Sequence, residues 1–424
     1  MHTLKEIYQD NEEHNFIDPS LYSRYRVKAG LRNDNGTGVK VGLTKICDVI
    51  GYKIIHEKKY NIDGQLIYRG YPINYLVNKQ PSDKICGFEE TAYLLIFGTL
   101  PNADQLKTFK DYLLNFKMGP VDLQYETPNI LNALQIEVLK LYAKDPSADT
   151  DDLEERMMKG LKILASIPLF TFSYARNKVF KSYPYPDRSL AENILCMARG
   201  NDQYTFEEAK IMDTLLMIHA DHGGGNNSTF ANVVISSTGT DIYSCISAAI
   251  GSLKGPKHGG ANCKVTNMFK AIFHEVGFTT DQATLKKIAN RILDKDFFDH
   301  SGLIYGIGHA IYTKSDPRAL LIHEQCEALA KSKGQEEIYN CIHAFEKVAI
   351  EVMKERKGID VCANVDYYSG YVYSLLGIEA DLFTPLFAIS RTAGWVSHHL
   401  ENRQSNRKLI RPANVYVGEM EEIK

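Results

Sequence analysis

Apolar residues at helical spacing fill most of this chain, and this pattern restricts its fold more than any other feature. From about residue 84 onward, apolar side chains recur at steps of three and four, as they do on the buried face of a helix. Residues 205–222 open with Thr205 and Glu208 in the spacing of a capping box, and three glycines follow the segment. The pattern predicts a mainly α-helical protein.

Two further segments carry helix boundary signals. Residues 240–255 repeat apolar side chains at helical steps, Thr240 or Asp241 can cap the start, and a glycine-proline pair ends the segment. The acidic stretch 144–156 is polar and rich in aspartate, which is typical of an exposed connection that leads into a helix. We therefore expect a helix after this connection, with an aspartate or a threonine as its cap.

Only one part of the chain favours strands. Residues 39–55 and 65–71 are rich in β-branched and aromatic side chains, with Asp63-Gly64 as the expected turn between the two runs. This predicts a small N-terminal β hairpin or sheet. Because strands do not alternate with helices afterwards, a doubly wound α/β fold is disfavoured. At 424 residues the chain exceeds the usual size of one hydrophobic core, so two domains are expected.

The charge balance narrows the class of partner. A formal net charge of -3 and a pI near 6.5 disfavour broad nucleic-acid binding, so an anionic substrate would have to meet locally placed arginines. The first residues are polar and acidic and lack the pattern of a signal or transit peptide. The longest apolar run, residues 163–172, is too short for a membrane span. We expect neither a nucleic-acid nor a membrane partner.

The cysteine pattern predicts the compartment. Eight cysteines are scattered along the chain without any Cys-x-x-Cys pair. In a chain of this length, that pattern is typical of free and mostly buried thiols in a reducing environment. A cytoplasmic location fits best.

Three histidines lie in sequence contexts that could carry chemistry. His219 and His222 are three residues apart in "IHADHGGGNNSTF" and are expected to share a face in the last helical turn, where they are either structural or ligands of a metal ion. The usual helical zinc motif, however, places its histidines four residues apart with a glutamate between them. His258 in "KGPKHGGAN" is expected between two helices, as a loop histidine or beside a ligand that contacts the main chain.

The segment "GLIYGIGHAIYTKSDPRA" places His309 directly after Gly306-x-Gly308. It lacks the third glycine and the preceding strand of a dinucleotide fingerprint, although the glycines would let a flat ligand lie on the backbone. Asp316-Pro317 is a common helix start, and Arg318 could be a surface residue.

Charged residues near the C-terminus leave two interpretations open. Asp366 precedes an aromatic helical run, so it is either a helix N-cap or a carboxylate whose apolar neighbours raise its pKa towards that of a general base. The last hundred residues also carry several arginines, most of them consistent with a solvated basic face. Arg391, among small and apolar residues, and Arg411, before a proline, fit that explanation less well.

Taken together, these blocks resemble the citrate synthase family. The resemblance rests on "HADHGGGNNSTFANVVISSTGTDIYSCISAAIGSLKGPKHGGAN", "GIGHAIYTKSDPRA", "NVDYYSGYVY", "FAISRTAGWVSHHLENR" and "LIRPANVYVG", which occur in the family's order and extend from about Gly38 to Gly418. It implies a mainly α-helical homodimer with two domains. The large domain would comprise residues 1–262 and 373–424, and the small domain, residues 263–372, would close over the active site.

The resemblance also implies roles for individual residues. His258 would hydrogen-bond the acetyl thioester oxygen, Asp366 would remove a methyl proton, and His309 would polarise the ketone of oxaloacetate and protonate the new alkoxide. The predicted contacts to oxaloacetate or citrate are His222, Arg318, Arg391 and, from the partner subunit, Arg411. The predicted contacts to coenzyme A are Gly306, Gly308 and Asn364. Thr313 stands where some relatives have an arginine near the coenzyme's phosphates.

The implied reaction joins acetyl-CoA, oxaloacetate and water to give citrate and coenzyme A, the entry step of the tricarboxylic acid cycle, with no metal or other cofactor. A 2-methylcitrate synthase that uses propionyl-CoA is the nearest alternative. Two alternatives belong to other classes. One is a helical metal-dependent hydrolase that uses His219, His222 and His258, and the other is a helical scaffold without catalytic activity.

Overall fold

The structure is a computed structural model that describes residues 4–10, 16–119, 123, 127–405 and 408–418. The chain divides into two compact units, Met1–Leu43 with Ile410–Lys424 and Thr44–Leu409. The described part of the first unit contains two short helices, α1 (Leu4–Asp10) and α2 (Ser20–Arg24), and a 3-10 turn at Ala29–Leu31. The second unit contains all the elements described below.

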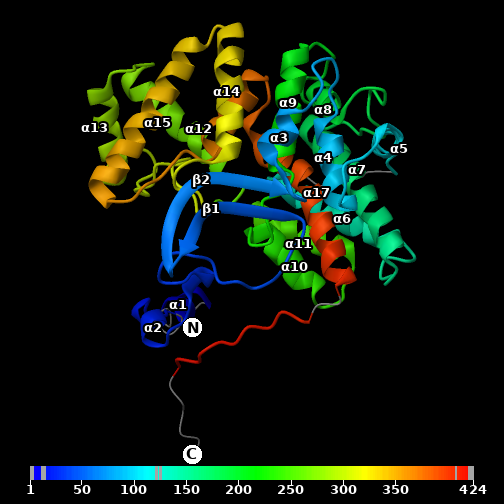
Figure 1. The fold of residues 1–424 in the computed structure, drawn as a ribbon, viewed down its shortest axis with the longest axis horizontal. Coiled ribbons are helices and arrows are strands. Elements are labelled where there is room, and N and C mark those ends of the chain that lie inside the picture. Colours follow the sequence, from blue (N-terminus) through cyan, green and yellow to red (C-terminus); the bar gives the residue numbers. More distant parts are fainter. Residues whose placement is uncertain (1–3, 11–15, 120–122, 124–126, 406–407, 419–424) are drawn as a thin grey trace, which may run out of the picture. The chain divides into compact units, whose positions relative to one another are not determined.

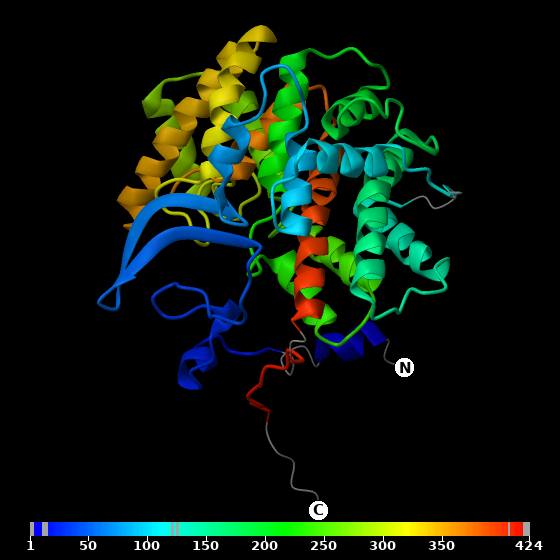
Figure 2. The same cartoon turned by 45° about the vertical axis from the view of Figure 1, so that its right-hand side comes forward.

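The second unit begins with a small antiparallel sheet. Its strands are β1 (Cys47–Ile55), β2 (Lys58–Tyr68) and β3 (Tyr71–Pro72), in that order. Figure 2 shows β1 and β2 as a long curved pair beside the helices. The predicted hairpin is present, but the predicted turn at Asp63-Gly64 and the strand over residues 39–46 were wrong. The turn lies at His56-Glu57, where both residues have positive φ, and Gly64 lies inside β2.

Gly64 serves close packing rather than a turn. A Cβ atom at this position would lie 2.1 Å from the carbonyl oxygen of Ser315, and the amide of Gly64 donates a hydrogen bond to the Ser315 hydroxyl. A glycine inside a strand often marks such a close approach of another backbone. The loop that follows His309 therefore packs directly on the hairpin.

Helices make up the rest of the second unit, which confirms the predicted mainly α-helical fold. They are α3 (Ile73–Asn78), α4 (Gly87–Phe97), α5 (Ala103–Leu114), α6 (Ile130–Ala143), α7 (Leu153–Arg176), α8 (Leu190–Arg199), α9 (Phe206–His219), α10 (Asn227–Ser236), α11 (Ile242–Leu253), α12 (Ala261–Val276), α13 (Gln282–Leu293), α14 (Pro317–Ser332), α15 (Glu336–Lys357), α16 (Val365–Leu375) and α17 (Phe383–Gln404). None of the helices in the described residues is long and apolar enough to cross a membrane. The eight cysteines are free thiols, and six of them are buried.

The predicted helix starts are confirmed by their hydrogen bonds. Thr205 and Glu208 form a capping box at the start of α9, and Asp241 accepts a hydrogen bond from the Ser244 amide at the start of α11. One predicted end was wrong, because α9 ends at His219 and not at His222. His222 therefore lies in the following loop, and the two histidines do not share a helical turn.

Helix α17 is the central element of the second unit. It packs against α4, α7, α9, α10 and α11, which lie around it in Figure 1. Most of its residues are buried. Helices α12 to α16 pack mainly on one another, through the pairs α12–α16, α13–α15 and α14–α16. The predicted domain boundaries after residues 262 and 372 both fall within this unit and remain a prediction.

A glycine allows α17 to approach the end of α9. The Gly394 amide lies 3.1 Å from the Ala220 carbonyl oxygen, and a Cβ atom at Gly394 would lie 2.6 Å from that oxygen and from Oδ1 of Asp221. This contact places Arg391, one turn earlier on α17, beside the loop that carries His222. Packing around Gly394 therefore positions residues of the predicted site.

We predict that Gly394→Ala lowers the free energy of unfolding by about 1–3 kcal/mol, because the new methyl group overlaps a backbone oxygen that cannot move away. Gly251→Ala is the matched control. A Cβ atom there meets only the end of the flexible Gln135 side chain, and the helix propensity of alanine offsets that contact. Urea unfolding of the two variants checks this, and equal midpoints would contradict the proposed packing role of Gly394.

Candidate active site

Six of the predicted site residues come together in the second unit, although the chain separates the first from the last by more than 160 positions. His222 interacts electrostatically with Arg318, His309, Arg391 and His258. Asp366 interacts in the same way with Arg318 and Arg391. The structure therefore assembles one cluster from loops and helix starts that are far apart in the sequence.

Arg391 is the most deeply buried charge of this cluster. It is 0% exposed on α17, its Nε donates a 2.7 Å hydrogen bond to the His219 carbonyl oxygen, and its guanidinium lies 4.7 Å from the ring centre of Phe387. Its Nη1 and Nη2 atoms are buried without a hydrogen-bond partner. A buried guanidinium with unpaired donors is costly, and a carboxylate with its two oxygens is the group that satisfies it best.

Arg318 is held in place by a carboxylate of its own. Its Nε and Nη2 atoms donate to the two carboxyl oxygens of Asp316 over 3.0 and 2.7 Å. Arg318 is 4% exposed, so the alternative of a surface arginine was wrong. Asp316 caps α14, with Pro317 at the first helical position, as the helix-start signal predicted. Asp316 also accepts a 3.2 Å hydrogen bond from the Val365 amide, and so it ties α14 to the start of α16.

Asp366 lies at the second position of α16, and the alternative of a helix N-cap was wrong. Asn364 caps this helix, because its side chain accepts a 3.0 Å hydrogen bond from the Asp366 amide. The Oδ1 atom of Asp366 is buried without a partner. Burial raises the pKa of Asp366 to about 7, Asp316 adds to the rise, and Arg318 and Arg391 oppose it. This places a proton acceptor of useful strength beside two arginines.

His222 and His309 lie edge to face in the cluster. Their ring centres are 5.2 Å apart, and the Nε2 atom of His222 is buried without a partner. Burial holds the pKa of His222 well below its usual range, so this ring is neutral. The Nδ1 atom of His309 accepts hydrogen bonds from the amides of Ile311 and Tyr312 over 3.0 and 3.1 Å. In a neutral His309 the ring proton is therefore on Nε2, which is a hydrogen-bond donor.

His258 lies between α11 and α12, as predicted. Its Nε2 atom is 3.1 Å from the hydroxyl of Ser228, a fully buried residue in the first turn of α10. Burial lowers the pKa of His258 to about 4, and Arg391 contributes to the same shift. His258 is therefore a neutral imidazole near pH 7. This property favours a role as a hydrogen-bond donor to a developing oxyanion.

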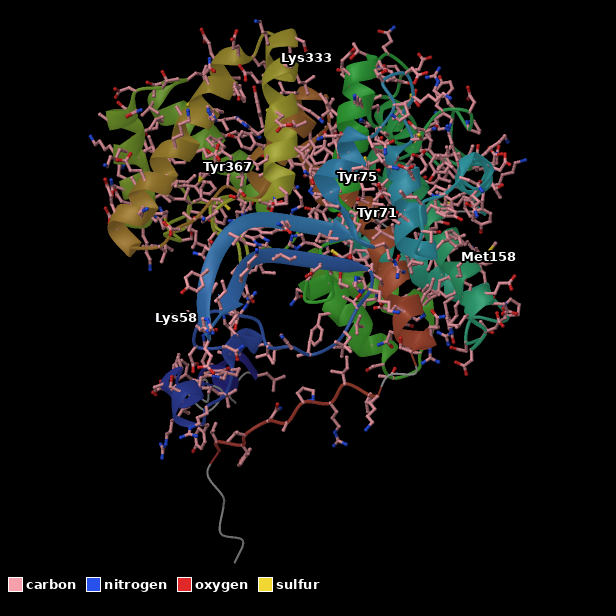
Figure 3. The ribbon with its side chains drawn as sticks, in the orientation of Figure 1. Lys58, Tyr71, Tyr75, Met158, Lys333 and Tyr367 are labelled. Atoms are coloured by element: carbon pink, nitrogen blue, oxygen red, sulfur yellow. The ribbon has the colours of Figure 1, made fainter. Side chains whose placement is uncertain are left out.

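Backbone hydrogen bonds join the loops that carry His309 and Asp366. The Asn364 amide donates to the Gly306 carbonyl oxygen over 2.9 Å, and its side-chain Nδ2 donates to the Gly308 carbonyl oxygen over 2.8 Å. Both glycines have positive φ, and a Cβ atom at Gly306 would lie 3.0 Å from the Cα atom of Tyr367, which Figure 3 labels. The predicted coenzyme region is thus one connected structure.

One predicted site residue, Arg411, is not part of this cluster. Arg411 lies in the other compact unit, so its role stays a prediction.

In the part of the chain that the structure describes, no three side chains of His, Cys, Asp or Glu are arranged to hold a metal ion. Nothing in the geometry therefore favours the metal-dependent hydrolase that was considered from His219, His222 and His258.

Sequence reasoning missed the residues that support the cluster from behind. Asp316 was interpreted only as a helix cap, although its place two residues before an arginine could have indicated the ion pair. Ser228 has no local signal, because its partner His258 is thirty residues away. The buried pair of His398 and Asp221, the residue before His222, has its atoms 3.0 Å apart and has no local signal either.

A family model described as citrate synthase, C-terminal domain, matches residues 33–413. The chain belongs to the citrate synthase family. Members of this family are enzymes, and they are acyltransferases of the citrate (Si)-synthase type. The resemblance noted in the sequence is thereby confirmed.

Individual members of this family are similar to this chain over most of their length. The chain is 37% identical to the citrate synthase of Haloferax volcanii, over 87% of this chain and 94% of that protein. It is 33% identical to 2-methylcitrate synthase 1 of Corynebacterium glutamicum, over 83% and 89% respectively. The crystal structure of citrate synthase from Thermotoga maritima superposes with a TM-score of 0.74 at 28% identity, covering 94% of this chain and 98% of that one.

A further solved structure contains ligands. It is described as the ternary complex of carboxymethyl coenzyme A and oxaloacetate with citrate synthase from Thermoplasma acidophilum. It superposes on this chain with a TM-score of 0.74 at 26% identity, covering 94% of this chain and 98% of that one.

We predict opposite effects on stability for the two aspartates beside Arg318. The raised pKa of Asp366 means that the folded state keeps a proton that the unfolded state releases, so its stability falls as the pH rises from about 4 to about 7. Asp366→Asn removes this loss, and its gain in unfolding free energy over the parent protein is larger at pH 8 than at pH 5 by about 1–3 kcal/mol.

Asp316→Asn is the control for this prediction. Burial alone would raise the pKa of Asp316, but Arg318 holds it below its usual value. Removing this charge leaves Arg318 buried and unpaired, which costs about 3–5 kcal/mol at both pH values. Urea unfolding at pH 5 and pH 8 measures both variants. A pH-independent effect of Asp366→Asn would show that Asp366 has an ordinary pKa.

Proposed function

We propose that this chain condenses an acyl-CoA with oxaloacetate and hydrolyses the resulting thioester, as a citrate synthase. With acetyl-CoA and water, the products are citrate and free coenzyme A. The observation that carries the proposal is the carboxyl of Asp366, which has a buried Oδ1 and a raised pKa and lies near two buried arginines that also interact with His222. The ligands of the Thermoplasma acidophilum complex, a coenzyme A derivative and oxaloacetate, support the same substrates here.

Oxaloacetate would be bound first by its carboxylates. The unpaired Nη1 and Nη2 atoms of Arg391 can donate to one carboxylate, while Arg318, held rigid by Asp316, is positioned for the other. The buried neutral ring of His222 can hydrogen-bond the same molecule. The Nε2–H group of His309 would then donate to the ketone oxygen and withdraw electron density from the ketone carbon.

The acyl thioester would be activated by a base and a donor acting together. Asp366 would remove a proton from the methyl carbon, and the neutral His258 would hydrogen-bond the thioester oxygen as charge develops there. A base with a pKa of about 7 is partly ionised at neutral pH and still accepts a proton effectively. The glycines at 306 and 308, with Asn364, form the surface that we assign to coenzyme A.

Carbon–carbon bond formation completes the first half of the reaction. The nucleophilic carbon of the enolate attacks the ketone carbon of oxaloacetate, and the ketone oxygen takes the Nε2 proton of His309. The His309 ring then regains a proton from solvent, and Asp366 releases the methyl proton that it removed. Water then attacks the thioester carbonyl of citryl-CoA, the C–S bond breaks, and the thiol of coenzyme A takes a proton. These steps need no metal ion or other cofactor in addition to the two substrates.

The choice of acyl group separates two members of the family. The relatives include citrate synthases and 2-methylcitrate synthases, and the second group is named for the product of a longer acyl chain. One additional methylene group usually changes the specificity by only about 1–3 kcal/mol. We propose acetyl-CoA as the main substrate, with propionyl-CoA as the alternative.

A thiol-release assay with oxaloacetate tests the reaction and its acyl specificity. We expect release from acetyl-CoA, with a higher kcat/KM than for propionyl-CoA, and no change when a chelator is added. Asp366→Asn should lower the rate by about two to four orders of magnitude. Preference for propionyl-CoA would favour the 2-methylcitrate alternative, and a loss of activity with chelator would contradict the proposed mechanism.

We also propose that the enzyme is a cytoplasmic homodimer in which Arg411 of one chain reaches the active site of the other. The family supports the dimer, and the eight free thiols support a reducing compartment. In the proposed arrangement, residues 263–372 close over bound oxaloacetate before the thioester binds.

Mixed dimers test the shared site. Arg411→Ala and Asp366→Asn each inactivate a homodimer, but a mixed dimer has one site in which both native residues are present. Mixing the two inactive variants under conditions of subunit exchange should restore about one quarter of the parent activity, since half of the dimers are mixed and each has one intact site. If mixed dimers form without activity, Arg411 does not act across the interface.

A further inference from the structure

The only tryptophan of the chain is bonded to the group that holds His258. Trp395 is 0% exposed on α17, and its indole Nε1 donates a 3.1 Å hydrogen bond to the hydroxyl oxygen of Ser228. The Nδ2 atom of Asn232 donates to the main-chain oxygen of Trp395 over 2.7 Å, which joins α10 to the backbone of α17 at this residue. The proposed function assigns no role to this residue.

Trp395 occupies a defined place relative to the proposed oxaloacetate site. It follows Arg391 by four positions, so the two side chains lie one turn apart on the same side of α17. One turn of this helix therefore carries both the guanidinium of the proposed oxaloacetate site and the indole N–H group that donates to Ser228, the hydrogen-bond partner of His258.

The hydroxyl of Ser228 has three neighbours and a limited number of bonds. It has one proton and two lone pairs, and its oxygen lies within hydrogen-bond distance of Trp395, His258 and the Asn226 side-chain oxygen, the last at 2.9 Å. The indole is a donor only, so it always occupies one lone pair. The hydroxyl proton then goes either to Asn226 or to the Nε2 atom of His258.

These two states correspond to different forms of His258. When Ser228 donates to Asn226, its second lone pair can accept a hydrogen bond from a protonated Nε2. A neutral His258 in this state has no proton on Nδ1. When Ser228 donates to Nε2, the proton of His258 is on Nδ1. Because Nε2 is engaged with Ser228, only Nδ1 is left for the thioester oxygen, and only the second state can donate to it.

We propose that Trp395 is a positioning residue that selects the donating form of His258 through Ser228. The inference rests on the proposed function, in which His258 donates to the thioester. An N–H group that donates to the Ser228 oxygen makes the hydroxyl a better donor and a poorer acceptor. It thereby favours the hydrogen bond from Ser228 to Nε2 and the proton on Nδ1.

Replacing the indole nitrogen alone tests this inference. Since the chain has one tryptophan, biosynthetic replacement of all tryptophan by β-(3-benzothienyl)alanine exchanges only the Trp395 N–H group for sulfur and preserves the ring shape. The matched control contains 4-fluorotryptophan, which keeps the N–H group. We expect kcat of the benzothienyl protein to be about 3- to 10-fold below that of the control. KM for oxaloacetate should be equal in the two proteins, because Trp395 acts on His258 and not on the arginines.

The same exchange in a Ser228→Ala background separates positioning from packing. If Trp395 acts through Ser228, removing the indole N–H causes no further loss of kcat in this background. An equal loss in both backgrounds would mean that the indole matters only for packing, and would overturn the inference. Equal kcat values for the benzothienyl and control proteins with native Ser228 would overturn it as well.

A measurement independent of turnover checks the hydrogen bond itself. ¹⁵N-labelled tryptophan gives a single indole N–H resonance in this protein, and Ser228→Ala should shift it markedly, whereas an unchanged resonance contradicts the bond. If the unmodified protein releases no thiol from acyl-CoA while the resonance does shift, the proposed function has failed and the role assigned to Trp395 fails with it. If thiol is released and the nitrogen exchange has no effect, only the inference about Trp395 has failed.

Discussion

The burial of the Arg391 guanidinium is the constraint on which the rest of the site depends. Its charge lies inside the helical packing of α17, and only Nε has a protein acceptor, the His219 carbonyl oxygen. A positive charge in such a place disfavours other positive charges nearby. Burial lowers the pKa of both His222 and His258, the charge of Arg391 adds to the shift, and both rings remain neutral. The buried arginine thus prepares the site for an anion and keeps the surrounding histidines in the form that donates or accepts hydrogen bonds.

The two aspartates beside Arg318 illustrate how position decides the chemistry of one residue type. Asp316 receives two hydrogen bonds from the Arg318 guanidinium and two more from the main-chain amides of Arg318 and Val365, so its pKa lies below the usual value. Asp366 has a buried oxygen without any donor, and its pKa rises to about 7. The charge of Arg318 and the hydrogen bonds that it donates outweigh burial at Asp316, whereas burial outweighs the attraction of Arg318 at Asp366. One carboxyl is therefore a permanent anion that fixes Arg318, and the other is a base that can exchange protons.

Close backbone approaches keep this arrangement in place. Gly394 brings α17 against the end of α9, and Gly64 brings the hairpin against the loop after His309. Hydrogen bonds between Asn364 and the two glycine carbonyl oxygens then join that loop to the start of α16. Main-chain contacts of this kind allow little adjustment, so a small side-chain cluster can depend on packing that extends well beyond it.

The sequence by itself determined the local features of this protein, because their signals act over a few residues. The sequence predicted the helical periodicity, the capping box at Thr205 and the helix start at Asp316-Pro317. Long motifs in family order identified the family and its candidate residues. The tertiary structure alone decided that α9 ends before His222, that the hairpin turns at His56-Glu57, that Asn364 caps α16 and that Arg318 is buried. It also decided which groups surround Asp366 and His258. Burial and pairing depend on atoms brought from distant positions, and no short stretch of the chain contains that information.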